Sequence, residues 1–172
     1  MKTKRLFLRE RTPEIRKHLL SLPHEEQLTF LGVDEDRLKL ELGWIEKGFS
    51  NFKMEYKMWD LIHLETKQVV GDCGFHSWYT NHFRAEIGYG LREGFKKQGF
   101  MSEAMSRILE YGFKEMNLNR VEAFISPENL NSRSLVEKFG FVLEGHLRQH
   151  YHNKAEGKIH DSVVYSLLKS EF

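Results

Sequence analysis

The sequence predicts a mixed-sheet α/β layer fold. Segments with apolar residues at every second position alternate along the chain with segments in which they recur every three or four positions. At two places, neighbouring strand patterns are separated only by a short polar turn, which indicates hairpins. The length of 172 residues and the hydrophobic content of 40% fit one globular domain covering residues 1–172.

The N-terminal third predicts one strand followed by three helices. Residues 3–9 alternate between apolar and polar side chains, as in a half-buried strand. Thr12, a typical N-cap residue, and Pro13 at the first helical position predict a helix that continues to Leu20. The next two helices are expected over residues 23–32 and 34–49, the last with Asp34 as its cap and an apolar series of Leu38, Leu42, Ile45 and Phe49.

The middle of the chain predicts a hairpin, a further strand and a long amphipathic helix. The expected segments are strand 52–64, turn 65–68, strand 69–79, strand 84–91 and a helix from Met101 to about Asn117. The strand 84–91 has one apolar face, and its other face carries only Glu86, Gly88 and Gly90. This second face is therefore nearly bare.

The C-terminal third predicts strands around a short helix. The expected segments are strand 121–125, loop 127–131, helix 132–139 stopped by Gly140, strand 141–151, a turn around Gly157 and strand 159–168. In strand 141–151, strict alternation predicts one polar face made by the even-numbered residues Glu144, His146, Arg148 and His150, continued by His152. Asp161 is expected opposite this face, across the hairpin.

Composition excludes several classes of protein. The 26 Lys and Arg residues balance 25 Asp and Glu residues, so no strong field favours nucleic acid or an acidic membrane. The single cysteine, Cys73, excludes an intramolecular disulfide and a multi-cysteine zinc site, and we expect a cytoplasmic protein. No signal peptide and no membrane-spanning segment are expected. Cys73 and Trp78 are expected to be core or strand residues.

The segment from Lys96 to Ser102 predicts an anion site. A Lys- and Gly-rich loop follows a strand and leads at once into a helix, whose first backbone N–H groups and dipole favour a phosphate. Gly99 permits close approach, and Lys96 and Lys97 add charge. The alternative is an ordinary solvated connection. A Walker loop is absent, and Gly88, Gly90 and Gly94 do not have the spacing of a dinucleotide fingerprint.

Motifs over almost the whole chain resemble those of the GCN5-related N-acetyltransferases (GNAT). Within this family, they resemble the subfamily that acetylates ribosomal-protein N-termini. The matching positions are Thr3, Arg5, Leu6, Leu8 and Arg9; Glu86 to Tyr89; Lys96 to Ala104; Pro127, Glu128, Asn129, Ser132, Glu137, Lys138, Gly140 and Phe141; and Glu144, Gly145, Leu147, Arg148, Asp161, Tyr165 and Leu167. The resemblance implies the GNAT fold: a central mixed, mostly antiparallel β-sheet, flanked by helices on both faces, that splays apart between its fourth and fifth strands.

The resemblance also implies acetyl-coenzyme A as the cosubstrate. Its pantetheine arm is expected to pair with the backbone of Tyr89, Gly90 and Leu91, where a backbone N–H also stabilises the oxyanion. Its pyrophosphate is expected at the loop and helix start, made by Lys96, Lys97, Gln98, Gly99, Phe100, Met101 and Ser102. Asn129 is expected to hydrogen-bond the pantetheine; its alternative role is that of a loop or N-cap residue.

The reaction implied by the resemblance is direct attack of a primary amine on the thioester. Glu86 is the first candidate for the general base, acting through water; the alternative is a structural carboxylate paired with Arg84 or with a buried backbone group. Many relatives protonate the leaving thiolate with a tyrosine, but here that position is Val136. Ser132 is therefore the candidate acid, unless it merely caps the helix; a thiolate can also leave without an acid.

The late histidines have three interpretations. His150 or His152 lines the acceptor cleft and acts as a base, the cluster binds a transition metal, or the face is simply solvated. We predict no metal. The expected function is acetylation of a protein N-terminus; the alternatives are acetylation of a small-molecule amine, such as a polyamine, an aminoglycoside or an amino acid, or a non-catalytic acyl-CoA-binding module. The expected partners are acetyl-CoA and an amine acceptor, with neither nucleic acid nor membrane, in a monomer or homodimer.

Overall fold

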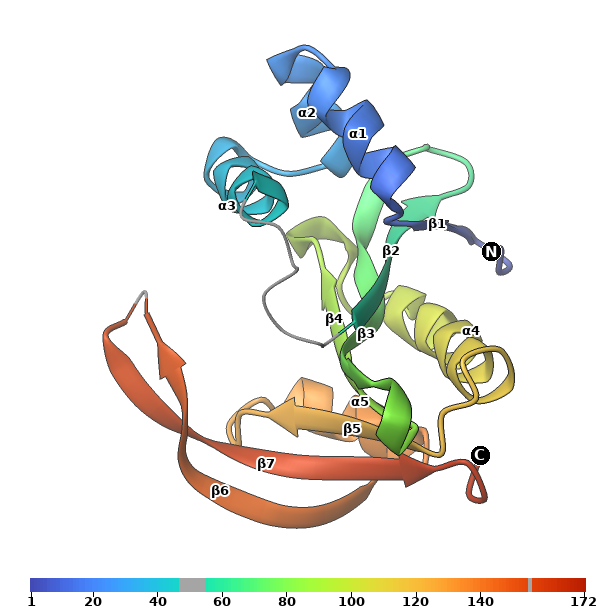
Figure 1. The fold of residues 1–172 in the computed structure, drawn as a ribbon, viewed down its shortest axis with the longest axis vertical. Helices are drawn as coiled ribbons and strands as arrows, with labels where there is room; N and C mark the ends of the chain where they lie inside the picture. Colours follow the sequence, from blue (N-terminus) through green and yellow to red (C-terminus); the bar gives the residue numbers. More distant parts are fainter. Residues whose placement is uncertain (47–54, 155) are drawn as a thin grey trace. The chain divides into compact units, whose positions relative to one another are not determined.

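The computed structural model describes residues 1–46, 55–154 and 156–172 (Figure 1). Within these residues, seven strands form one mixed, mostly antiparallel sheet with the order β1-β2-β3-β4-β5-β7-β6, and helices flank it, which confirms the predicted fold class. The strands are β1 (Leu6–Glu10), β2 (Glu55–His63), β3 (Val69–Tyr79), β4 (Arg84–Leu91), β5 (Arg120–Ile125), β6 (Val142–Asn153) and β7 (Lys158–Leu168). The helices are α1 (Pro13–Ser21), α2 (His24–Leu31), α3 (Glu35–Glu46), α4 (Phe100–Lys114) and α5 (Leu130–Lys138).

The chain divides into two compact units. The first comprises Met1–Gly74 and Tyr89–Ile108, and the second comprises Phe75–Gly88 and Leu109–Phe172. Strands β3 and β4 and helix α4 each contribute residues to both units. The single domain expected from the chain length stays a prediction. None of the helices in the described residues is both long enough and apolar enough to cross a membrane.

Helices α1, α2 and α3 of the first unit form at the predicted places, and capping residues mark the starts of α1 and α3 and the end of α2. The Thr12 side chain accepts a hydrogen bond from the Ile15 N–H at 3.3 Å, and Asp34 Oδ1 accepts one from the Arg37 N–H at 2.9 Å. Gly32 adopts the left-handed conformation that ends α2. Leu19, Leu31 and Leu38 pack together in a buried cluster. Phe49 and the start of strand 52–64 lie outside the described residues.

A buried charge cluster joins strands β1, β2 and β3 of the first unit. Asp60 is only 1% exposed and lies opposite Arg9 in the antiparallel pairing of β1 with β2. Its Oδ2 accepts a hydrogen bond from Arg9 Nη2, and its Oδ1 one from Arg11 Nε, both at 2.8 Å. Arg11 Nη2 also donates to Asp72 Oδ2 at 3.0 Å. Burial alone would lower the pKa of Arg11, but Asp60 and Asp72 raise it above its ordinary value.

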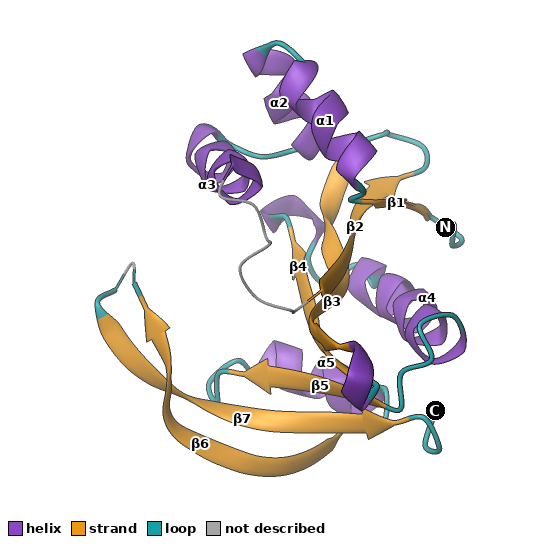
Figure 2. Cartoon of the chain, viewed as in Figure 1, coloured by secondary structure: helices purple, strands orange, loops and turns teal. Residues whose placement is uncertain are grey.

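In the second unit, the pairing between β4 and β5 stops early. These parallel strands are in register at three positions, the last being Glu86 opposite Glu122, although β4 continues to Gly88 within this unit and β5 to Ile125. The splay expected between the fourth and fifth strands stays a prediction. On its other side, β5 pairs with β7 over six residues. Helix α5 lies beside β5 (Figure 2).

Two helix boundaries differ from the prediction. Helix α4 ends at Lys114 rather than near Asn117, and Asn117 has a left-handed backbone. Helix α5 begins at Leu130, two residues before Ser132, because the Asn129 side chain caps it by accepting a hydrogen bond from the Ser132 N–H at 3.1 Å. Ser132 is therefore inside the first turn. Helix α5 ends at Lys138, and Gly140, two residues later, has the left-handed backbone that was predicted to stop it.

Strand β6 does not present the single polar face that alternation predicted, and that prediction is wrong. The pairing with β7 shifts register between Leu143 and Gly145 and again between Leu147 and Tyr151. At the second shift, three residues of β6 lie opposite one residue of β7, Asp161, whose Oδ1 accepts a hydrogen bond from the Gln149 N–H at 2.8 Å. We call Arg148, Gln149 and His150 the β6 bulge. A bulge redirects the side chains that follow it, so even-numbered residues no longer share one face.

A second charge cluster crosses strands β4, β5 and β6 in the second unit. Glu122 accepts hydrogen bonds from Arg84 at 2.6 Å and from Arg120 at 2.8 Å. Arg120 also binds Glu144, whose Oε1 accepts a further hydrogen bond from Ser166 Oγ at 2.7 Å. Hydrogen bonds from Arg120 and then from Ser166 lower the pKa of Glu144 from 4.5 to about 2.

The lowered pKa of Glu144 predicts acid sensitivity. Its stabilising contribution is complete above pH 4.5 and is lost as the pH falls towards 2, because the unfolded chain takes up the proton first. We expect the urea midpoint of the unmodified protein to fall more steeply between pH 5 and pH 2.5 than that of Glu144→Gln. Glu115→Gln, an exposed residue without an ion pair in the described residues, should follow the unmodified protein. Parallel curves for the unmodified protein and Glu144→Gln would contradict the prediction.

Candidate active site

The predicted phosphate loop lies in the first unit and leads directly into α4. After β4, a short 3₁₀ turn at Glu93–Phe95 is followed by Lys96 to Gly99, and α4 begins at Phe100. Lys97 and Gly99 both have left-handed backbones, with φ of 59° and 82°. The first helix-type bond is donated by the Glu103 N–H to Gly99 O at 3.1 Å. The N–H groups of Phe100 and Met101 precede it and therefore have no acceptor within the helix.

The two lysines of the loop differ in what they can offer a ligand. Lys96 Nζ is bound to the Glu93 carboxylate three residues earlier, so its charge is partly neutralised. The Lys97 side chain is exposed and makes no hydrogen bond or ion pair with the described residues. Of the predicted pair of charges, Lys97 is therefore the one available to an anion.

The side chains of Phe100 and Met101 anchor the helix rather than facing solvent. They are 4% and 7% exposed, and the Phe100 ring contacts His63 and Phe95 edge-on. Their predicted contribution to a cofactor site is therefore restricted to the backbone. Ser102 is half-buried in the first turn of α4.

Arg5 holds the loop from the N-terminal side, a role that the sequence did not reveal. Its Nη1 donates to Gln98 O at 3.0 Å, its Nε to Glu103 Oε2 at 2.8 Å, and its guanidinium lies 4.3 Å from the centre of the Phe100 ring. Burial alone would raise the pKa of Glu103, but hydrogen bonds from Thr3 and Arg5 lower it below its ordinary value. Arg5 and Glu103 together fix the loop relative to the first turn of α4.

Tyr89, Gly90 and Leu91 end strand β4 in the first unit, close to the neighbouring strand β3. A Cβ atom added to Gly71 of β3 would lie 2.1 Å from the Gly90 carbonyl oxygen, so the two backbones approach too closely for any side chain at Gly71. This packing places the backbone of β4 firmly against β3. The pairing of pantetheine with this strand stays a prediction.

Glu86 lies in the second unit beside His76, a residue that the sequence did not single out. The His76 Nδ1 atom is 3.5 Å from Glu86 Oε2, and both side chains are partly exposed. The His76 ring also covers Gly88, where an added Cβ would lie within 2.9 Å of it. The bare face of β4 at Gly88 is therefore occupied by His76. Arg84 pairs with Glu122 instead of Glu86, so the alternative of an Arg84–Glu86 pair is wrong.

Asn129 and Ser132 mark the start of helix α5 in the second unit. Because Asn129 Oδ1 accepts the Ser132 N–H, Asn129 has the capping role that was its alternative interpretation, and the capping role proposed for Ser132 is wrong. The Asn129 Nδ2 group has no partner in the described residues and remains able to donate. Val136 is completely buried, so this position belongs to the core and offers no proton.

The β6 bulge turns His150 onto the face of the sheet that carries Glu86. The His150 ring stacks on Phe124 at 5.1 Å, and its Nδ1 lies 3.1 Å from Ser162 Oγ. The strand registers place Phe124 and Ser162 on the same face as Glu86. His150 Nε2 has no partner in the described residues. A proton acceptor or donor is thus held in a fixed orientation by Ser162 and Phe124.

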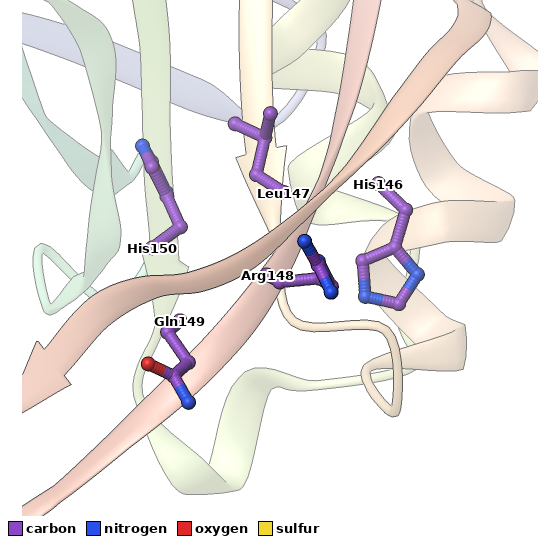
Figure 3. Close-up of a pocket in the computed structure, with 5 residues that line it drawn as sticks. All are labelled: His146, Leu147, Arg148, Gln149 and His150. Atoms are coloured by element: carbon purple, nitrogen blue, oxygen red, sulfur yellow. The ribbon is translucent and has the colours of Figure 1, made fainter.

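The other histidines of β6 do not join His150. His146 points away from it (Figure 3), and its Nε2 lies 2.7 Å from Asp161 Oδ2. Asp161 and Ser162 are consecutive residues of β7, so their partners His146 and His150 lie on opposite faces. His152 is exposed. In the described part of the chain, no group of three or more His, Cys, Asp or Glu residues is arranged to hold a metal ion.

The predicted site residues therefore fall into two groups. Tyr89 to Leu91 and Lys96 to Ser102 belong to the first unit, whereas Glu86, Asn129, Ser132 and His150 belong to the second. Glu86 and Tyr89 are three residues apart on the same strand. Cys73 and Trp78 lie in β3 as expected; Cys73 is fully buried, and burial raises the pKa of its thiol.

The fold and the loop define a class of protein, and comparison with known families agrees. A model of the acetyltransferase (GNAT) domain matches residues 5–142. Because the match covers most of the chain, the chain belongs to the GNAT acetyltransferases, a family of acyltransferases that use acetyl-CoA as cosubstrate.

The chain is similar to several bacterial members of this family. It is 31% identical to the N-acetyltransferase YoaA of Bacillus subtilis over 98% of this chain and 96% of that protein. It is 43% identical to the N-acetyltransferase p20 of Bacillus licheniformis over 65% of this chain, a match that spans 62% of p20. Among solved structures, an acetyltransferase of the GNAT family from Bacillus anthracis is 25% identical with a TM-score of 0.71, covering 99% of both chains.

Two further matches carry the names of acceptors. The putative ribosomal N-acetyltransferase YdaF of Bacillus subtilis is 38% identical over 60% of this chain and 56% of that protein. A spermidine N-acetyltransferase from Vibrio cholerae is 20% identical with a TM-score of 0.72, covering 96% of this chain and 95% of that structure. At this identity, the second match shows a shared fold only.

Proposed function

We propose that this protein transfers the acetyl group of acetyl-CoA to the α-amino group of a protein N-terminus, of the ribosomal-protein type. The observation that carries the proposal is the loop of Lys96 to Gly99, whose left-handed residues bring it directly into the first turn of α4. The N–H groups of Phe100 and Met101 and the Lys97 ammonium suit a pyrophosphate. Arg5 keeps this arrangement in place through Gln98 O and Glu103.

The remaining donor contacts come from backbone and amide groups. The backbone of Tyr89, Gly90 and Leu91 pairs with the pantetheine amides, and a backbone N–H of this strand stabilises the oxyanion. Asn129 donates its Nδ2 group to the pantetheine while its Oδ1 remains the cap of α5. These two functions are compatible because they use different atoms of the side chain.

The transfer proceeds by direct attack of the neutral amine on the thioester. Glu86 takes up the proton of the attacking amine through a water molecule, and His76 fixes the orientation of its carboxylate. His150 offers a second proton acceptor through Nε2. Attack forms the C–N bond of the amide and breaks the C–S bond of the thioester; the Ser132 hydroxyl gives its proton to the departing thiolate, which becomes the free thiol of CoA, and regains a proton from water. An α-amino group, with a pKa near 7.7 to 8.0, needs little help to be neutral at pH 7.

Calorimetry with acetyl-CoA tests the donor site, and two glycines provide a matched pair of variants. Gly99→Ala places a Cβ on a left-handed residue, which costs about 1–2 kcal/mol and reshapes the loop. We expect acetyl-CoA to bind it at least about tenfold more weakly than the unmodified protein. Gly94→Ala meets no atom within 4 Å and should bind normally.

The outcomes of this titration are distinct. Absence of acetyl-CoA binding by the unmodified protein at millimolar ligand would refute the proposed function. Equal affinity of both glycine variants for acetyl-CoA would instead show that the loop is not part of the cofactor site. The transfer reaction itself would then still have to be tested. Thermal unfolding separates loss of the site from loss of the fold, because Gly99→Ala should still be fully folded at the temperature of the titration.

A small-molecule amine is the second candidate acceptor, because the fold is shared with a spermidine acetyltransferase. Thiol release with a panel of N-terminal peptides and polyamines separates the two, and activity on polyamines alone would exclude the protein substrate. A non-catalytic acyl-CoA-binding module, suggested by Val136 in place of an acid, predicts binding of acetyl-CoA without thiol release. A cytoplasmic location and a monomeric or homodimeric state stay predictions.

A further inference from the structure

The β6 bulge lines an open hollow that contains basic groups and no carboxylate. The hollow has a volume of about 750 Å³ and is lined by His146, Leu147, Arg148, Gln149 and His150 (Figure 3). All five residues come from one stretch of β6. Its chemistry is therefore set by one guanidinium, two imidazoles, one amide and one apolar side chain.

The carboxylates near this hollow are already engaged. Asp161 Oδ1 accepts a hydrogen bond from the Gln149 N–H at 2.8 Å, and Asp161 Oδ2 lies 2.7 Å from His146 Nε2. Glu156, at the turn of the hairpin, binds Asn153 Nδ2 at 2.7 Å and His160 Nε2 at 3.1 Å. Both carboxylates are therefore held by contacts within the hairpin.

Arg148 differs from these groups because its guanidinium has no hydrogen-bond partner in the described residues. Its charge acts on Asp161 through space only, and the side chain is exposed. An exposed arginine beside imidazoles repels a polycation and attracts a carboxylate, which it binds with two parallel hydrogen bonds. The hollow is therefore suited to an anionic ligand.

We infer that the acceptor carries a carboxylate close to its reacting amine and that Arg148 binds this carboxylate. The inference rests on the proposed transfer reaction and specifies its substrate class. Arg148 and His150 line the same hollow from different sides of β6: Arg148 lies beside His146 (Figure 3) and acts on Asp161, whereas His150 lies on the sheet face of Glu86. A peptide that binds Arg148 through an acidic side chain can cross this hollow, so that its N-terminus extends towards His150. A polyamine has no group for Arg148.

The test compares three acceptors: a synthetic hexapeptide with N-terminal alanine followed by aspartate and glutamate, the same peptide with lysines in place of the acidic residues, and spermidine. Thiol release gives kcat/KM, and fluorescence anisotropy of C-terminally labelled peptides gives binding without acetyl-CoA. We expect the acidic peptide to be preferred by about tenfold or more in both measurements. Arg148→Ala should bring the two peptides close to parity, and Arg148→Glu should reverse the preference.

Lys114→Ala, which removes an exposed cation of α4 paired with Glu110, is the matched control and should keep the preference for the acidic peptide. An unchanged preference in Arg148→Glu, or a preference of the unmodified protein for the lysine peptide or for spermidine, would overturn the inference. Failure to bind acetyl-CoA would contradict the proposed function instead. Because anisotropy reads peptide binding without the cosubstrate, the role of Arg148 is decided in either case.

Discussion

Replacing Asp60 by asparagine is expected to lower the free energy of unfolding by about 3–5 kcal/mol, because two arginines then face a buried neutral amide. Asp60 is 1% exposed and binds both Arg9 and Arg11. Asparagine has nearly the same shape, so lost packing contributes little. Chemical denaturation followed by far-UV circular dichroism measures the change, and the thermal midpoint should fall in parallel.

The control for Asp60→Asn is a variant that breaks an ion pair at the surface. Glu110→Gln removes the partner of Lys114, whose side chain is 66% exposed, and should change the free energy of unfolding by less than about 1 kcal/mol. A change of similar size in both variants would show that burial is not what makes the Asp60 cluster matter. The unfolding of the first unit is the relevant transition, since Arg9, Arg11, Asp60 and Asp72 all belong to it.

Replacing Glu86 by glutamine is expected to lower kcat about 100-fold or more at pH 7, because the attacking amine loses its proton acceptor. Affinity for acetyl-CoA should stay unchanged, since no cofactor contact is proposed for this side chain. The deficit should persist as the pH passes the pKa of the acceptor amine, because a larger neutral fraction raises both rates alike and the neutral amine still loses a proton as it attacks. Initial rates of thiol release from pH 6 to 9 measure both effects.

Glu115→Gln, at an exposed position just after α4, serves as the control for Glu86→Gln and should retain the full rate. His76→Ala distinguishes orientation from proton transfer: it should lower kcat less than Glu86→Gln does, since the carboxylate remains. A kcat of Glu86→Gln within twofold of the unmodified protein at pH 7 would exclude Glu86 as the base and leave His150 as the next candidate.

Local patterns predicted the positions of most elements. Strands β3 and β4 have the predicted bounds, since their alternating residues end at a turn on either side. The start of α4 was also evident, because Gly99 is followed at once by apolar residues at helical spacing. The start of α5 was less evident: Asn129 and Ser132 are both good caps, and only the structure shows which side chain accepts the hydrogen bond.

Features that depend on distant residues could not be predicted. Arg5 and Glu103 are 98 residues apart, and their contact forms only when the folded first unit brings the start of β1 to the first turn of α4. His76 reaches Glu86 only because β3 and β4 are neighbours and Gly88 leaves room for the ring. The β6 bulge contains Gln149 in a left-handed conformation, for which an ordinary polar residue gives no signal. Its effect was to reverse the prediction that His146 and His150 share a face.

The β6 bulge also implies a conflict between two kinds of selection on this hairpin. Removing two of its three residues would leave one opposite Asp161 and restore an uninterrupted ladder between β6 and β7. Such a shortened hairpin gains regular backbone pairing, but His150 loses its place on Phe124 and Ser162. Screens for thermal stability are therefore expected to favour deletions here, and screens for acetylation to reject them.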